Sequence, residues 1–181
     1  MSENISYSHE ENNTEYGFIS SNIINKIGPH ADSPQIKNKF PDIFDSYFKF
    51  CVVRNPYDRI VSRYFWDLKV NEIEKKISFK EYLENEDTKG LINKINDDWY
   101  DRCTIYNNPI CDYYIKFNQL EEGIKEVFDK LNINDKIDTS VIINENNING
   151  REKYQLFYND YTKEIVYRNC IQEIKYFNWK F

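Results

Sequence analysis

The sequence predicts an α/β domain in which short buried strands alternate with amphipathic helices. Two apolar, β-prone segments, 48–53 and 111–117, are each followed by an apolar stripe at helical spacing. This alternation favours a mainly parallel sheet flanked by helices. The chain has 181 residues, of which 40% are hydrophobic and 30% charged, which fits one globular domain with a sizeable core.

The domain is expected to begin near residue 29. Residues 1–28 form a polar lead-in, and Gly28-Pro29 breaks the chain after it. Asp32 or Ser33 before Pro34 then predicts a short helix over 34–40, with the proline near the first helical position. Pro41 ends that helix. The domain therefore extends over 29–181.

The first predicted strand, 48–53, ends abruptly at Arg54-Asn55-Pro56. Asn55 is a good N-cap and Pro56 a good first helical residue, so a helix is expected to follow directly. The apolar side chains of that helix recur at helical spacing, which predicts one buried face. They are Val61, Tyr64, Phe65 and Leu68.

The second half of the chain repeats the alternation. Ser78 with Glu81 forms a capping-box pattern that opens a helix through about residue 83. Residues 84–108 are polar and predict no particular element. The second strand, 111–117, precedes an amphipathic helix over 120–131. After an Asn-rich loop over 132–150, a helix is predicted over 161–177.

The turn after the first strand carries the chemistry. Arg54 stands at the carboxyl end of a buried strand, the edge where open α/β sheets bind ligands. A helix beginning at Asn55 offers backbone N–H groups and a positive dipole end, both suited to an anion. Arg59, Ser62 and Arg63 stand at i, i+3 and i+4, so they can share one helix face. This arrangement predicts a phosphate site.

A second interpretation of the same residues stays open. Asn-Pro is a common helix start, Asp58 can neutralise a neighbouring arginine, and Arg59 and Arg63 can be solvated surface residues. Charge favours the anion site locally: the chain carries −6 overall, whereas 49–69 has five cationic side chains against two aspartates, a local +3. The overall charge argues against a general nucleic-acid binder.

The segment FKFCVVRNPYDRIVSRY, residues 48–64, resembles the 3′-phosphate-binding motif of sulfotransferases that use PAPS (3′-phosphoadenosine 5′-phosphosulfate), of the carbohydrate type found in bacteria and in heparan and chondroitin sulfation. The resemblance implies that Arg54 and Ser62 hold the 3′-phosphate of PAPS. Arg59 and Arg63, on the same turn, are expected to contribute to that cofactor site.

The resemblance continues along 29–181. HADSPQIKNKF, CDYYIKFNQLEEGIKEVF and YNDYTKEIVYRNCIQEIKYFNWKF are similar to further segments of that family, with Lys116 in place of the usual Arg and Asn118 in place of an acidic residue. They imply the P-loop-like sulfotransferase fold. Residues 1–30 contain no match to the family's basic Gly/Ser/Thr-rich loop for the 5′-phosphosulfate, so the first strand and loop are expected to be missing.

The resemblance implies an enzyme that transfers a sulfonate from PAPS to a hydroxyl of a carbohydrate or related acceptor. His30 is the candidate base, because imidazole titrates near neutral pH; the alternative is an ordinary loop histidine. Because the loop is missing, the alternative for the whole chain is a truncated or degenerate, inactive nucleotide-binding remnant. A kinase is disfavoured, since neither a G-x-x-x-x-G-K-[ST] nor a G-x-G-x-x-G motif occurs.

The remaining expectations concern location and metals. No signal peptide or membrane span is evident, which predicts a cytoplasmic protein. The net charge of −6 predicts that it has no nucleic-acid partner. The cysteines are scattered without a C-x-x-C pair, so free buried thiols are favoured over disulfides, and no metal site is expected. They are Cys51, Cys103, Cys111 and Cys170.

Overall fold

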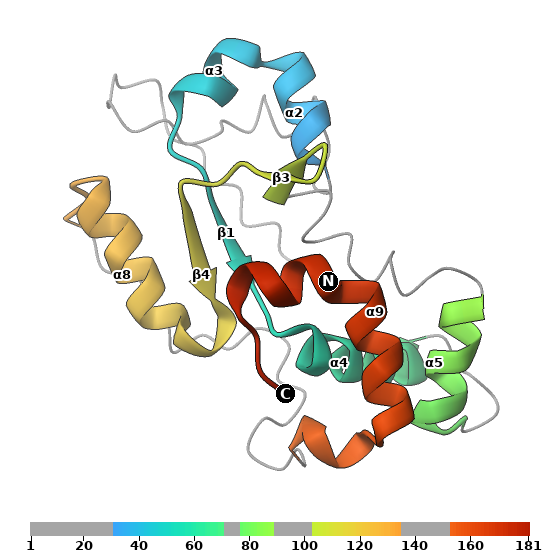
Figure 1. Cartoon of the computed structure of the whole chain (residues 1–181). Helices are drawn as coiled ribbons and strands as arrows, with labels where there is room; N and C mark the ends of the chain where they lie inside the picture. The colour runs from blue at the N-terminus through green and yellow to red at the C-terminus, as the bar shows by residue number, and fades with distance from the viewer. Residues whose placement is uncertain (1–30, 71–76, 89–102, 135–152) are drawn as a thin grey trace, which may run out of the picture.

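The computed structural model describes residues 31–70, 77–88, 103–134 and 153–181 (Figure 1). The described part combines helices with two small sheets, in agreement with the predicted α/β class. The lead-in 1–28 and the candidate base His30 lie outside the described residues. None of the helices in the described ranges is long and apolar enough to cross a membrane.

The predicted parallel pairing is present. Strand β1 (Phe50–Val53) lies beside β4 (Tyr113–Lys116) in parallel, with Phe50 opposite Tyr113 and Val53 opposite Lys116. Both strands are shorter than predicted but fall within the predicted segments. Their carboxyl ends meet at one edge of the sheet, because the register keeps Val53 level with Lys116.

Helix α8 (Leu120–Lys130) covers β4, which it follows after the short 3₁₀ turn η1 (Phe117–Gln119). Figure 1 shows α8 running alongside the strand. The close approach needs a glycine: a Cβ on Gly123 would overlap the side chain of Ile115, which is 1% exposed. The backbone of α8 therefore packs directly against the Ile115 side chain of β4 at this point.

The main core lies between three helices. Helix α4 (Pro56–Val70) directly follows the turn after β1 and packs against α5 (Phe79–Thr88) and α9 (Asp160–Phe177), with the 3₁₀ turn η2 (Tyr154–Phe157) against α4. The most buried hydrophobic side chains of this core come from all three helices and include Ile60, Val61, Leu83, Ile165, Val166 and Cys170.

Two of the three helices in this core, α5 and α9, begin with a capping box. Ser78 accepts a hydrogen bond from the N–H of Glu81, whose carboxylate accepts from the Ser78 N–H, which confirms the predicted capping box. The hydrogen bond from the Ser78 backbone lowers the pKa of the Glu81 carboxyl. The second box, Asn159 with Thr162 at the start of α9, was not predicted from the sequence.

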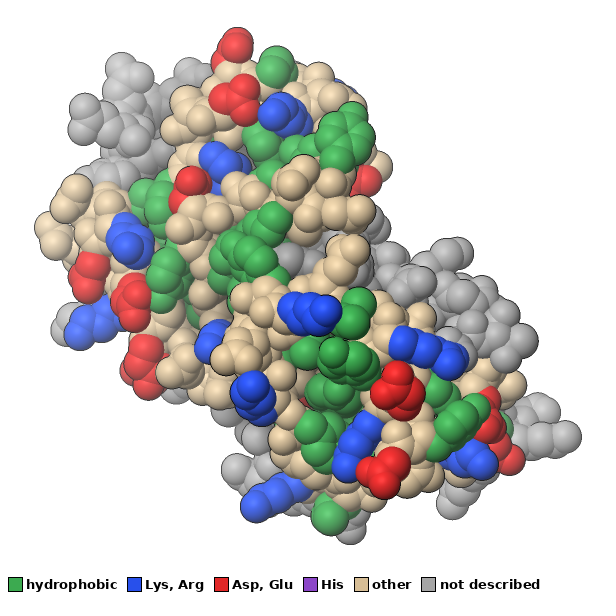
Figure 2. Space-filling view, viewed as in Figure 1, with side chains coloured by type: hydrophobic (Ala, Val, Ile, Leu, Met, Phe, Trp, Pro, Cys, Tyr) green, Lys and Arg blue, Asp and Glu red, His purple; other side chains and the backbone are tan. Residues whose placement is uncertain are grey.

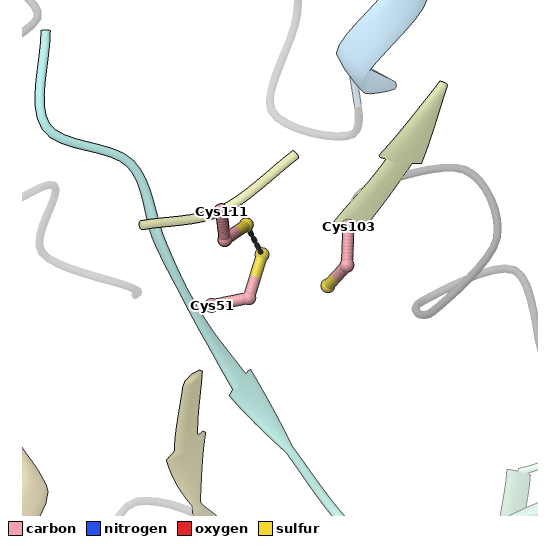
Figure 3. A group of neighbouring side chains, drawn as sticks. All are labelled: Cys51, Cys103 and Cys111. Atoms are coloured by element: carbon pink, nitrogen blue, oxygen red, sulfur yellow. Dashed lines mark hydrogen bonds between the residues drawn. The ribbon is translucent and has the colours of Figure 1, made fainter. Parts of the chain in front are cut away.

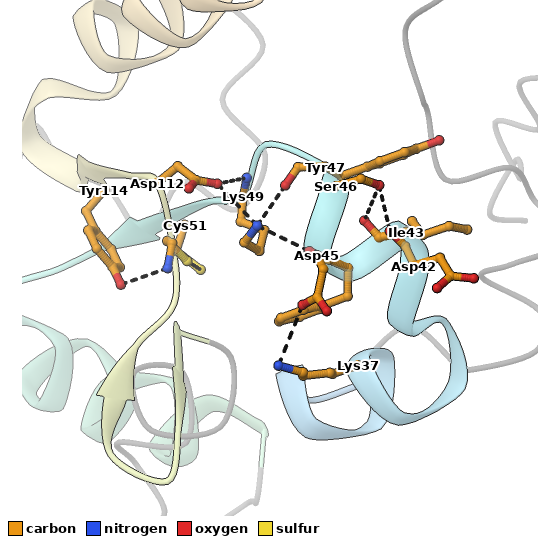
Figure 4. Close-up of polar contacts among 12 residues, drawn as sticks. Lys37, Asp42, Ile43, Asp45, Ser46, Tyr47, Lys49, Cys51, Asp112 and Tyr114 are labelled. Carbon is orange, nitrogen blue, oxygen red and sulfur yellow. Dashed lines mark hydrogen bonds and ion pairs between the residues drawn. The ribbon is translucent and has the colours of Figure 1, made fainter.

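Residues before β1 form two short helices, α2 (Ser33–Lys39) and α3 (Pro41–Ser46). The first was predicted; the second was not, because it is only six residues long. Lys49 joins this unit to the sheet: its Nζ lies 2.8 Å from the Tyr47 carbonyl and 3.4 Å from Asp112 (Figure 4). The backbone N–H of Lys49 also donates to Asp112.

A small antiparallel hairpin stands in the polar stretch that predicted no element. Its strands are β2 (Thr104–Ile105) and β3 (Asn108–Pro109). Tyr106 and Asn107 form the tip with φ values of 50° and 62°, a left-handed conformation that asparagine tolerates better than tyrosine. Two such residues in succession, without a glycine, are a poor sequence signal for a tight hairpin.

Candidate functional site

Arg54 lies at the carboxyl end of β1, as predicted, and its guanidinium is held from three sides. Its Nε donates to Asp58 at 2.6 Å, and Nη1 donates to Ser62 Oγ at 3.2 Å. The ring of Phe117 lies against the guanidinium, 4.6 Å from the central carbon to the ring centroid. The structure thus brings together the two residues that the family resemblance assigned to a 3′-phosphate.

These contacts leave one edge of the guanidinium available. Among the described residues, Nη2 of Arg54 has no hydrogen-bond partner, and the Ser62 hydroxyl accepts from Arg54 without donating onward. The Arg54 side chain is 24% exposed. The Nη1–Nη2 edge is the end-on fork that binds two oxygens of one phosphate. Asp58 holds the Nε side and so orients the guanidinium, while Ser62 takes one of the two Nη1 hydrogens and leaves the other for a further acceptor.

The start of α4 is organised around Asn55. Its Oδ1 accepts from the Tyr57 N–H at 3.1 Å, and its carbonyl accepts from Arg59 N–H. Pro56 has no N–H to give. Two of the helix-start N–H groups that the sequence offered to an anion are therefore absent or already bonded. Side chains, rather than helix-start amides, supply most of the donors here.

The end of the chain closes over this turn. Asn55 Nδ2 donates to the carbonyl of Lys180 at 2.8 Å. Asn178 ends α9 in the left-handed conformation, which turns the last residues back. The ring of Phe181 then packs edge-on against Tyr57 and Tyr158. The carboxyl-terminal segment thus packs on the turn that follows Arg54, a contact that the sequence did not reveal.

Arg59 has a different environment from Arg54. Its guanidinium makes two hydrogen bonds to the carboxylate of Glu173 on α9, at 2.8 and 2.7 Å, and Nη1 also donates to the Arg54 carbonyl at 3.2 Å. The Arg59 side chain is 12% exposed and Glu173 is completely buried. This ion pair ties α4 to α9 and holds the backbone of the turn. A contact of Arg59 with phosphate stays a prediction.

Arg63 faces another carboxylate. Its Nε lies 3.0 Å from both oxygens of Asp67, one turn further along α4, and Tyr82 donates to Asp67 at 2.7 Å. The Arg63 side chain is 54% exposed. Its predicted part in the cofactor site likewise stays a prediction. Its exposure is compatible with the second interpretation given for it, a solvated surface residue, whereas its pairing with Asp67 was not predicted.

Phe117 is the residue of this site that sequence reasoning missed. It follows β4 directly, as Arg54 follows β1, and the parallel register brings both strand ends to the same edge. Lys116, the last residue of β4, has its Nζ 5.3 Å from the ring of Trp179. The signal was available: residues after two paired parallel strands are expected to meet.

The wider surface is mixed in charge. On the face shown in Figure 2, Lys and Arg side chains of the described residues are interspersed with Asp and Glu, and hydrophobic side chains lie between them. On this face the described residues form no continuous basic stripe, the feature expected of a protein that binds an extended polyanion.

A model of the sulfotransferase family matches residues 8–180, nearly the whole chain. A protein of Archaeoglobus fulgidus, described only as uncharacterized, is 26% identical over 99 residues, which are 55% of this chain and 79% of that protein. No solved structure matches the chain significantly.

Proposed function

Since the chain belongs to the sulfotransferase family, we propose that it binds PAPS and transfers its sulfonate to a hydroxyl of a carbohydrate or related acceptor. The observation that carries the proposal is the Arg54 fork beside Ser62 at the carboxyl end of β1. Membership of the family supports sulfonate transfer in general. The nucleotide contacts and the class of acceptor are the parts proposed.

In this proposal the 3′-phosphate lies against the Nη1–Nη2 edge of Arg54 and accepts the hydroxyl hydrogen of Ser62. Asp58 and Phe117 fix the plane of the guanidinium from two other directions. Such preorganisation reduces the side-chain entropy lost on binding. A hydrogen bond to a charged group contributes about 1.5–3 kcal/mol, so Arg54 accounts for roughly 10- to 100-fold in affinity.

The reaction itself needs few protein groups. An acceptor oxygen attacks the sulfur of PAPS, the bond from sulfur to the 5′-phosphate oxygen breaks, and adenosine 3′,5′-bisphosphate leaves. The acceptor proton goes to a base, for which His30 is proposed on its residue type and place in the sequence. Cationic donors stabilise the charge that develops on the leaving oxygen.

The test is a transfer assay with PAPS carrying a labelled sulfonate and a panel of hydroxylated sugars. The proposal predicts labelled product and stoichiometric adenosine 3′,5′-bisphosphate, with both strongly reduced in Arg54→Ala and in Ser62→Ala. Arg168→Ala removes the same charge from an exposed position on α9 and is expected to retain activity. Transfer at an unchanged rate in Arg54→Ala would refute the assigned nucleotide site.

The alternative of an inactive remnant predicts a different combination of results. Nucleotide binding that depends on Arg54, together with no transfer to any acceptor in the panel, would support the remnant. The His30→Ala variant separates the roles further, because a lost base lowers transfer and leaves nucleotide affinity unchanged. If His30→Ala transfers sulfonate normally, the base lies elsewhere.

A further inference from the structure

Three of the four cysteines converge on one point of the structure, although 60 residues separate Cys51 from Cys111 (Figure 3). Cys51 comes from β1, Cys111 from the segment before β4 and Cys103 from the residue before β2. The Sγ atoms of Cys51 and Cys111 are 3.2 Å apart, and all three sulfurs lie within 4.8 Å of one another. No disulfide joins them.

The backbone around the three sulfurs is fixed by hydrogen bonds. The Tyr114 hydroxyl accepts from the Cys111 N–H at 3.1 Å and donates to the Cys103 carbonyl at 3.3 Å, so one side chain connects two of the three segments. Lys49 and Asp112 exchange hydrogen bonds immediately beside Cys51 and Cys111. These contacts set the positions of the cysteines independently of any bond between the sulfurs.

We propose that Cys51, Cys103 and Cys111 form a binding site for a zinc ion. Three thiolates are a sulfur-rich donor set of the kind that zinc prefers. At a Zn–S distance of about 2.3 Å, tetrahedral ligands lie about 3.8 Å from one another. The observed spacing of 3.2 to 4.8 Å needs sulfur displacements of no more than about 1 Å to reach it.

Burial and coordination number fit the same ion. Cys103 is 2% exposed, whereas Cys51 and Cys111 are half-buried, so the cluster lies at the boundary of the core. Three protein ligands leave a fourth position for water or another small ligand. Tyr114 supports such a site without contacting the ion, because its hydroxyl is hydrogen-bonded to the backbone of two of the ligands.

The sequence predicted no metal because the ligands lack the paired spacing of common zinc motifs. The proposal changes the interpretation of these thiols from inert core residues to ligands. A zinc ion would link β1, the β2–β3 hairpin and the start of β4, where the sheet has only two described strands. Cys51 lies three residues before Arg54, so the ion would stabilise the strand that carries the nucleotide site.

The test uses the full chain, reduced and freed of metal, and does not depend on nucleotide binding or transfer. We expect one zinc per chain by native mass spectrometry and a higher melting temperature with zinc, as mass action requires. Cobalt(II) in its place is expected to show thiolate-to-metal charge transfer and the absorption of a tetrahedral complex. A wild-type cobalt spectrum without sulfur charge transfer would overturn the proposal even if every variant failed to fold.

The variants locate the ligands. Cys51→Ala, Cys103→Ala and Cys111→Ala are each expected to weaken zinc binding by more than about 100-fold, since even changes to second-shell partners cost 10- to 100-fold. Tyr114→Phe is expected to weaken it about tenfold. Cys170→Ala is the matched control, because Cys170 is completely buried in the separate helical core, and it is expected to retain full affinity.

Three further outcomes would contradict a zinc site. The first is that zinc forms no one-to-one complex with the chain. The second is that all three cluster variants still bind zinc. The third is that the reduced chain does not bind zinc but forms a Cys51–Cys111 disulfide in air. The last result would assign the pair to redox chemistry instead.

Discussion

Glu173→Gln is expected to lower the free energy of unfolding more than the corresponding change at any exposed carboxylate. Glu173 is completely buried and accepts both bonds of the Arg59 fork, whose side chain is 12% exposed. The amide keeps the shape but presents one oxygen and one N–H₂, so an arginine N–H loses its acceptor and a buried charge loses its partner. Breaking a buried pair costs about 3–5 kcal/mol, a large part of the 5–15 kcal/mol typical of a domain.

The assay is equilibrium unfolding in urea. With a slope of about 2 kcal/mol per molar, that loss moves the midpoint down by roughly 1.5–2.5 M. Asp45→Asn is the matched control, because Asp45 pairs with Lys37 at 3.6 Å on the surface and its side chain is 67% exposed. Such pairs contribute at most about 1 kcal/mol. The control midpoint is therefore expected to stay close to that of the original chain.

A double variant distinguishes two causes of the destabilisation: loss of the attraction between the two charges, and the cost of leaving one buried charge unpaired. Replacing Arg59 and Glu173 together by Met removes both charges, and the double variant is expected to be more stable than either single one, since buried pairs exchange for apolar residues at little cost. Equal urea midpoints for Glu173→Gln and Asp45→Asn would refute the assignment of Arg59 and Glu173 to a buried structural pair. So would a double variant whose loss of stability equals the sum of the losses in Arg59→Met and Glu173→Met.

Three further changes probe other contacts. Ser78→Ala removes the cap of α5 and is expected to lower the free energy of unfolding, measured in urea, by about 1 kcal/mol. An unchanged free energy of unfolding would show that the cap does not stabilise the helix. Gly123→Ala forces a methyl group into Ile115 and is expected to cost about 1–3 kcal/mol by the same assay; an unchanged midpoint would mean that α8 does not press on β4. Phe117→Ala frees the guanidinium of Arg54 and is expected to weaken binding of adenosine 3′,5′-bisphosphate several-fold with little change in melting temperature, and equal affinity would contradict its positioning role.

The elements that the sequence predicted well are those whose signals are local. The strand ending at Arg54, the helix start at Asn55-Pro56 and the Ser78 box each depend on residues within a few positions of one another. Backbone geometry and capping act over that range. These local signals were sufficient to place Arg54 beside Ser62.

What the sequence did not reveal depends on contacts between distant segments. The partner of Arg59 is Glu173, 114 residues away, and periodicity on α9 gave no reason to single out that carboxylate. Cys103 and Cys111 flank a hairpin with an unusual tip, so their approach to Cys51 was invisible in the spacing. Of these long-range contacts, the one between Phe117 and Arg54 could have been predicted from the sequence, because parallel strands end at a common edge.

Calorimetric titration with adenosine 3′,5′-bisphosphate and with 5′-AMP tests the central claim most directly. The two ligands differ by the 3′-phosphate, so their affinity difference measures what Arg54 and Ser62 are proposed to hold. We predict that the original chain and Arg168→Ala prefer the bisphosphate, and that Arg54→Ala weakens its binding roughly 10- to 100-fold while leaving 5′-AMP unaffected. Equal binding of the two ligands by the original chain, or an undiminished preference in Arg54→Ala, would contradict the account.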